Sequence, residues 1–177
     1  MVPDELTIQN FMSMPTTRKV IEDHRLPVGL ELEEVETIGL PMKKLKHLML
    51  LSDKDSSLSL VTKHMIRTVI ETVSGHKVTI LDPTDEYKTF VASVNNYVPS
   101  TSDFKSVIEQ LQSQVQYARQ NGGDFEHYIF ITDMGQFVSE SGVDTNDIAQ
   151  LMEEGLKVGL HFVFSMHKNF ISAYNDT

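Results

Sequence analysis

A chain of 177 residues is long enough for one domain with a substantial hydrophobic core. Its 40% hydrophobic and 23% charged residues are typical of a globular protein, and no apolar run is long enough to cross a bilayer. Fifteen basic against 25 acidic residues give a net charge of −10, which argues against nucleic acid as a partner. Because the chain lacks cysteine and its N-terminus lacks an export signal, we expect a reducing compartment such as the cytoplasm and no direct membrane insertion.

The first part of the chain is weakly patterned. Residues 1–25 carry scattered apolar side chains without a strong period, and we interpret them as a lead-in segment or interdomain linker. Alternating apolar residues then predict two short extended segments, at 26–33 and 35–40. We therefore predict that the main domain covers residues 26–177.

From His47 onward, predicted strands alternate with predicted helices. Four almost continuous apolar runs have the pattern of parallel strands buried on both faces, namely 47–51, 77–81, 127–132 and 160–164. Between them, apolar residues at helical spacing predict three helices. The first covers 57–73, the second begins at Thr101 or Ser102, and the third begins at Asp144 or Thr145. Residues 95–99 are compatible with a loop or a short strand. The alternation predicts an α/β domain with a mainly parallel sheet flanked by helices.

Polar residues stand at the carboxyl ends of the four predicted strands, where open α/β sheets bind ligands: Ser52, Asp82, Asp133 and Ser165. Asp82, Asp85 and Asp133 could form a carboxylate cluster for hydrolysis. We favour a structural or vestigial role for them, because the phosphate-binding residues described next are replaced, and Asp82 before Pro83 could simply cap a turn. No pair among the histidines, His161 and His167 included, has the spacing of metal ligands with a third donor nearby, so we predict no metal site.

The segment between the first buried strand and its helix has the position and length of a phosphate-binding loop. In the pattern Gly-x-x-x-x-Gly-Lys-Ser/Thr, the glycines let backbone N–H groups wrap the phosphates, the lysine neutralises them and the hydroxyl holds magnesium. Residues 52–59 read SDKDSSLS. Ser52 and Ser57 occupy the glycine positions, Leu58 the lysine position and Ser59 the hydroxyl position. The frame is present, but its phosphate-binding residues are replaced.

These replacements predict weak or absent binding of ATP and magnesium, and we expect no cofactor. A serine costs about 1 kcal/mol or more where the backbone must be left-handed, so we expect a different loop shape. Asp53 and Asp55 add negative charge that Lys54 offsets only in part. One pair of like charges about 4 Å apart costs about 4 kcal/mol at an effective dielectric constant of about 20, or about a thousandfold in affinity.

The third buried strand lacks the expected catalytic base. In active P-loop ATPases this strand ends in Asp-Glu, where the aspartate orders magnesium and the glutamate activates the attacking water. Here Asp133 is kept, and Met134 replaces the glutamate. Two independent losses predict that this domain is not an enzyme.

The order and spacing of the segments resemble the FtsK/SpoIIIE-type P-loop ATPase domain over about residues 26 to 170. The resemblance rests on LPVGL at 26–30, HLMLL at 47–51, ILDP at 80–83, IFITD at 129–133 and VGLHFVF at 158–164. Within that family, the lost nucleotide motifs, the acidic charge and the lead-in are most similar to the degenerate last ATPase module of EssC-type type VII secretion coupling proteins. The chain departs from the family at residues 165–168, where SMHK replaces Thr-Gln-Arg-Pro. The strands that complete the family's fold would follow Thr177, so we expect a truncated C-terminus.

The resemblance implies a RecA-like fold and a cytoplasmic domain of a membrane-anchored protein whose other domains hydrolyse ATP. It implies a pseudo-ATPase module that regulates a type VII secretion motor or recognises secreted WXG-motif substrates, with neighbouring ATPase domains of the same chain as partners. Met134, Phe137 and Phe170 could line a groove for a partner helix, although ordinary packing explains them equally well. Two alternatives stay open: an active ATPase or DNA translocase, and a purely structural domain that supports an active neighbour.

Overall fold

The computed structural model describes residues 7–31, 33–41, 45–73, 75–123 and 126–168. They form two compact units, one from residues 1–45 and 64–74, the other from 46–63 and 75–177. The boundary between the units crosses helix α3 (Asp55–Thr72).

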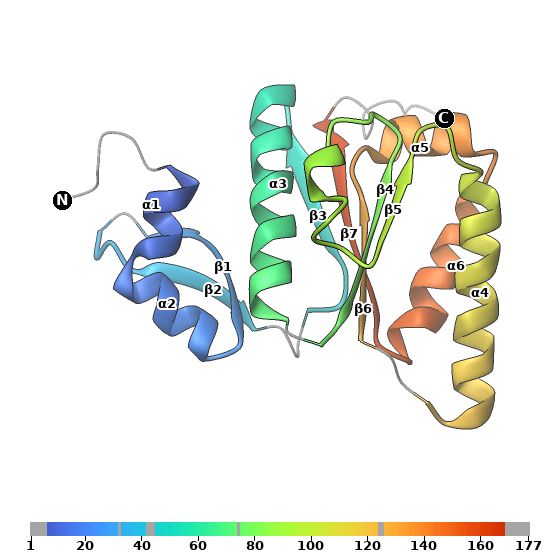
Figure 1. The fold of residues 1–177 in the computed structure, drawn as a ribbon, viewed down its shortest axis with the longest axis horizontal. Helices are drawn as coiled ribbons and strands as arrows, with labels where there is room; N and C mark the ends of the chain where they lie inside the picture. Colours follow the sequence, from blue (N-terminus) through green and yellow to red (C-terminus); the bar gives the residue numbers. More distant parts are fainter. Residues whose placement is uncertain (1–6, 32, 42–44, 74, 124–125, 169–177) are drawn as a thin grey trace. The chain divides into compact units, whose positions relative to one another are not determined.

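The first unit contains two short helices and an antiparallel strand pair, drawn in blue in Figure 1. Its elements are α1 (Ile8–Ser13), α2 (Pro15–Glu22), β1 (Arg25–Leu30) and β2 (Thr37–Pro41). The strands match the two predicted extended segments. The helices were not expected, because their apolar residues are divided between two short helices that meet at Pro15, and neither is long enough to show a period. The domain boundary at residue 26 stays a prediction.

A threonine cluster joins α2 to the strand pair. The hydroxyl of Thr37 lies 2.9 Å from that of Thr16 and 2.8 Å from that of Thr17. Gly39 on β2 faces Val20 so closely that an added Cβ would lie 2.4 Å from its methyl group. Only glycine therefore fits at this contact between α2 and β2.

The second unit contains a five-stranded parallel sheet in the order β3-β7-β6-β4-β5. The strands are β3 (Leu48–Ser52), β4 (Lys77–Asp82), β5 (Asn96–Pro99), β6 (His127–Ile131) and β7 (Leu160–His167). This sheet confirms the predicted fold class. The ambiguous segment at 95–99 is a strand, and β7 continues beyond the predicted end at residue 164.

Helices α4 (Phe104–Asn121) and α6 (Thr145–Leu156) lie side by side on one face of this sheet (Figure 1). Their apolar stripes pack on inward-facing strand residues to form a core that includes Leu81, Ile129, Ile131, Phe162, Ile108, Leu111, Ile148 and Leu151. On the other face, Thr62 in the first half of α3 contacts Ser165 of β7, with hydroxyl oxygens 2.5 Å apart.

Two helix starts differ from the predictions. Asp103 caps α4, because its carboxylate accepts a hydrogen bond from the Ser106 amide. The predicted starts, Thr101 and Ser102, lie before this cap. Helix α5 (Met134–Ser141) was not predicted. It begins directly after β6 and is too short to show a clear apolar period in the sequence.

Candidate functional site

The turn between β3 and α3 is shorter than a phosphate-binding loop. Strand β3 ends at Ser52 and α3 begins at Asp55, so only two residues separate them. The Ser52 hydroxyl closes this turn, because it accepts a hydrogen bond from the Lys54 amide and donates one to the Lys54 carbonyl, both 3.0 Å long. The Leu58 amide donates to the same carbonyl at 3.0 Å, as in a regular helix.

The backbone of this turn also lacks left-handed geometry. Among the described residues other than glycine, only His24, Val35 and Asp85 have a positive φ, and none of them lies in 52–59. Residues 55–59, which would help to wrap the phosphates in a functional loop, form the first turns of α3. The loop has a different shape, as the serine substitutions led us to expect.

A cleft of about 400 Å³ lies beside this turn, at the carboxyl ends of β4 and β6. It is lined by Asp55, Leu58, Ser59, Thr84, Glu86, Tyr87, Thr132, Asp133 and Gln136. The predicted site residues Leu58, Ser59 and Asp133 are thus brought together, whereas Ser52, Ser57 and Met134 are not part of the lining. Of the described residues that line the cleft, three are carboxylates and none is a lysine or arginine.

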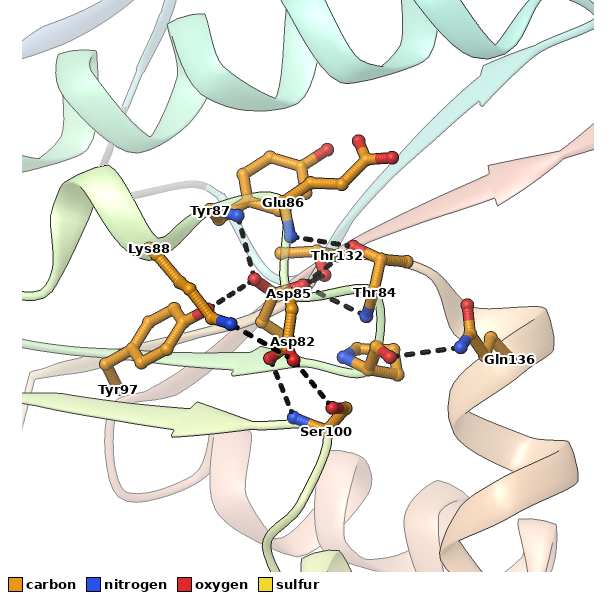
Figure 2. Close-up of polar contacts among 11 residues, drawn as sticks. Asp82, Thr84, Asp85, Glu86, Tyr87, Lys88, Tyr97, Ser100, Thr132 and Gln136 are labelled. Atoms are coloured by element: carbon orange, nitrogen blue, oxygen red, sulfur yellow. Dashed lines mark hydrogen bonds and ion pairs between the residues drawn. The ribbon is translucent and has the colours of Figure 1, made fainter.

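Asp82, the last residue of β4, is completely buried behind the cleft wall (Figure 2). Its Oδ1 accepts hydrogen bonds from the Thr84 amide at 3.2 Å, the Thr84 hydroxyl at 2.8 Å and the Thr132 hydroxyl at 2.9 Å. Its Oδ2 accepts from the Tyr87 amide at 2.8 Å and the Tyr97 hydroxyl at 2.6 Å. The carboxylate therefore joins the start of the β4–β5 loop (residues 83–95) to β5 and to the end of β6.

Asp85 makes a second connection within this region (Figure 2). Its carboxylate accepts hydrogen bonds from the Ser100 amide at 3.1 Å and the Ser100 hydroxyl at 2.8 Å, and the Lys88 ammonium lies 3.3 Å away. The hydrogen bonds from Ser100 lower the pKa of the Asp85 carboxyl. Asp85 has a φ of +61°, and aspartate and asparagine tolerate this left-handed geometry better than most residues.

Asp133 caps helix α5. Its carboxylate accepts a hydrogen bond from the Gln136 amide at 2.9 Å, and the Gln136 side chain donates to the Pro83 carbonyl at 3.0 Å. Asp82, Asp85 and Asp133 therefore take part in three separate sets of structural hydrogen bonds. This arrangement supports the structural alternative for the three aspartates.

Tyr87 forms part of the cleft wall although it is only 3% exposed. The Lys63 ammonium lies 5.4 Å from the centre of its ring, and burial raises the pKa of its phenol. Burial and the adjacent Asp82 carboxylate likewise raise the pKa of Tyr97. Neither tyrosine was predicted from the sequence, in which the only local signal is the Asp-Pro pair that begins the loop.

The three predicted partner-binding residues are placed differently. Phe137 is completely buried and packs edge-on against Phe104, with ring centres 5.2 Å apart. Met134 is half-buried and packs against the same core. Phe170 lies outside the described residues. Phe137 is thus a core residue, and the role of all three residues in partner binding stays a prediction.

No known protein-family model matches this chain. The curated protein "Type VII secretion system protein EssC" of Staphylococcus aureus (strain MSSA476) is 25% identical over 182 residues. That alignment covers 99% of this chain and 12% of the relative, so the chain spans about an eighth of the relative's length. Within the described residues, no helix is both long and apolar enough to span a membrane.

Solved structures with the same fold come from two related proteins. EssC (ATPases 2 and 3) from Geobacillus thermodenitrificans matches with a TM-score of 0.78 and 16% identity, over 97% of this chain and 34% of that one. The cytoplasmic domain of the type VII secretion ATPase EccC from Thermomonospora curvata matches with a TM-score of 0.76 and 14% identity, over 98% of this chain and 22% of that one.

A second structure of the Thermomonospora protein contains ATPases 2 and 3 in complex with a signal sequence peptide. It matches with a TM-score of 0.68 and 13% identity, over 88% of this chain and 31% of that one. Over 99% of its length, this chain is homologous to the type VII secretion coupling ATPase EssC, and its parallel sheet has the fold of the P-loop ATPase domains of EssC and EccC.

Proposed function

We propose that this chain is a non-catalytic P-loop module of a type VII secretion motor, which regulates the motor or recognises secreted substrates. The observation that supports the proposal is the charge of the cleft beside the β3–α3 turn. Leu58, which the sequence pattern aligns with the phosphate-binding lysine, lines this cleft together with Asp55, Glu86 and Asp133. The lining disfavours Mg-ATP, because a polyphosphate requires positive charge, and the described residues of the lining include three carboxylates and no lysine or arginine.

The proposed partners are protein segments. The Thermomonospora EccC structure was solved with a signal sequence peptide, and the solved EssC and EccC chains contain more than one ATPase domain. We infer that this module contacts neighbouring ATPase domains of the same chain and binds the tails of secreted WXG-motif proteins. We also infer that it is a cytoplasmic domain of a membrane-anchored protein whose other domains hydrolyse ATP.

Calorimetric titration with Mg-ATP, together with an assay for phosphate release, tests the non-catalytic assignment. We expect no heat of binding up to millimolar ATP and no hydrolysis. Micromolar binding with turnover would instead support the active ATPase. Binding to DNA at moderate salt would support the translocase.

The variant Leu58→Lys separates the effect of charge from that of loop shape. We expect it to remain without micromolar ATP affinity, because residues 55–59 stay helical and the three carboxylates remain. The expected gain in affinity is about tenfold or less, which corresponds to about 1.4 kcal/mol. Leu58→Met, which adds no charge, is the matched control, and micromolar binding by Leu58→Lys alone would show that the loop shape is adequate.

A further inference from the structure

We propose that Asp82 is the positioning residue of the cleft, and that its carboxylate holds the β4–β5 loop (residues 83–95) as the wall opposite α3. This loop contributes Thr84, Glu86 and Tyr87 to the cleft lining. The Tyr87 amide and both the amide and the hydroxyl of Thr84 donate hydrogen bonds to Asp82. Asp82 itself does not line the cleft, so it acts through these residues.

The position of Asp82 in the sheet explains why it can hold this wall. Strand β4 lies between β6 and β5, so a side chain at its carboxyl end can reach both neighbours. Thr132, directly after β6, and Tyr97, on β5, donate to its two oxygens from opposite sides. The loop is thereby fastened to three adjacent strands at one point (Figure 2).

The pattern of donors makes a carboxylate specifically suitable here. Each oxygen of Asp82 accepts a backbone amide, Oδ1 from Thr84 and Oδ2 from Tyr87. Hydroxyl groups can rotate to change their role, but a backbone N–H can only donate. In Asp82→Asn, the side-chain amide has two orientations, and each of them places its NH2 group against one of these two backbone N–H donors.

Asp85→Asn is a matched control in the same loop. The Asp85 carboxylate has one backbone donor and one hydroxyl donor, both from Ser100. An asparagine can accept from the Ser100 amide and donate to the rotated Ser100 hydroxyl. The left-handed backbone of Asp85 also tolerates asparagine, so only the exposed contact with Lys88 is lost.

Amide hydrogen exchange of the 177-residue chain tests the proposal. In Asp82→Asn we expect the Tyr87 amide and its neighbours in 83–95 to exchange about ten to a hundred times faster, the factor expected for the loss of a hydrogen bond to a charged group. Asp85→Asn should leave these rates within about threefold of those of the unsubstituted chain. The core variant Ile129→Ala should lower global stability through a substitution outside the loop. The general rise in exchange rates that it causes is subtracted from the rise seen with Asp82→Asn.

The shape of the cleft can be followed with a fluorescent reporter, since the chain contains no tryptophan. Leu58→Trp places an indole on the α3 side of the cleft, in place of an apolar side chain that makes no hydrogen bond to the loop. We expect its emission to shift to longer wavelength and its quenching by acrylamide to increase with Asp82→Asn, but not with Asp85→Asn or Ile129→Ala. Equal exchange in the two aspartate variants, or an unmoved reporter, overturns the proposal.

If Asp82→Asn does not fold, Tyr97→Phe removes a single donor and keeps the carboxylate. Faster exchange confined to 83–95 then supports the proposal, and exchange that matches the unsubstituted chain overturns it. The inference rests on the proposed function for the importance of the cleft. Its test uses no nucleotide, so ATP binding in the calorimeter would contradict the proposed function and leave the result for Asp82 intact.

Discussion

The two walls of the cleft differ in how their polar groups are held. On the β4 side, Asp82 is completely buried and accepts hydrogen bonds from residues up to 50 positions away in the chain. On the α3 side, residues 53–57 are exposed, and the turn is held by the hydroxyl of Ser52 and by the ring of His167, which lies 3.1 Å from the Asp53 carbonyl. One wall therefore depends on a buried polar network, whereas the other is a surface turn in which we expect substitutions to be tolerated.

Among substitutions in the two walls, Asp82→Ala should lower the free energy of unfolding most. It leaves the buried amide of Tyr87 and the half-buried amide of Thr84 without their acceptor, and a buried unsatisfied group costs about 1–3 kcal/mol. We expect a loss of about 3 kcal/mol or more in the free energy of unfolding, measured by urea denaturation. A loss below about 1 kcal/mol would mean that water replaces the carboxylate without difficulty.

The amino end of the sheet contains another buried polar residue. His127 begins β6, its Nε2 lies 2.9 Å from the Thr79 hydroxyl, and burial lowers its pKa to about 4. The unfolded histidine binds a proton below a pH of about 6.5, and the folded one only near its lowered pKa. The unfolded state therefore binds more protons between these values, and stability falls as pH falls through that window.

His127→Gln should reduce this acid sensitivity. We expect the loss of stability between a pH of about 6.5 and 4 to decrease by up to about 3 kcal/mol, measured as urea midpoints across that range. Thr79→Val keeps the histidine and should keep the pH dependence. Identical pH profiles for His127→Gln and the unsubstituted chain would assign the acid sensitivity to other groups.

Asp133→Ala should lower the free energy of unfolding less than Asp82→Ala does. It removes the cap of α5, and the loss of a helix cap typically costs about 1 kcal/mol. Thermal or urea unfolding measures the change, and Asp133→Ser, which can still cap the helix, should recover most of it. If Asp133→Ser is as unstable as Asp133→Ala, Asp133 makes a contribution beyond capping.

Ser52→Ala should have the smallest effect, because the hydroxyl of Ser52 only closes a surface turn. We expect a cost below about 1 kcal/mol in the free energy of unfolding. Circular dichroism during urea unfolding is sufficient to measure it, with Ser56→Ala as a control on the exposed side of the same turn. A cost similar to that of Asp82→Ala would remove the distinction between the two walls.

Much of the fold can be predicted from local patterns. The apolar runs of β3, β4, β6 and β7 and the stripes of α4 and α6 are long enough to identify the elements and the parallel sheet. Helices α1, α2 and α5 were missed because short helices show too little of their period. The start of α3 was predicted at Ser57 and lies at Asp55, since the exposed polar residues of its first turn carry no apolar signal.

The chemical composition of the candidate site follows from the amino-acid sequence, because the absence of a lysine at position 58 and of a glutamate at position 134 does not depend on the fold. Which polar residues meet depends on the tertiary structure. Tyr97 and Thr132 reach Asp82 because β4 lies between β5 and β6, and this strand order depends on the packing of the whole sheet. Periodicity reports which face of an element is buried, but it does not report which strand lies beside it.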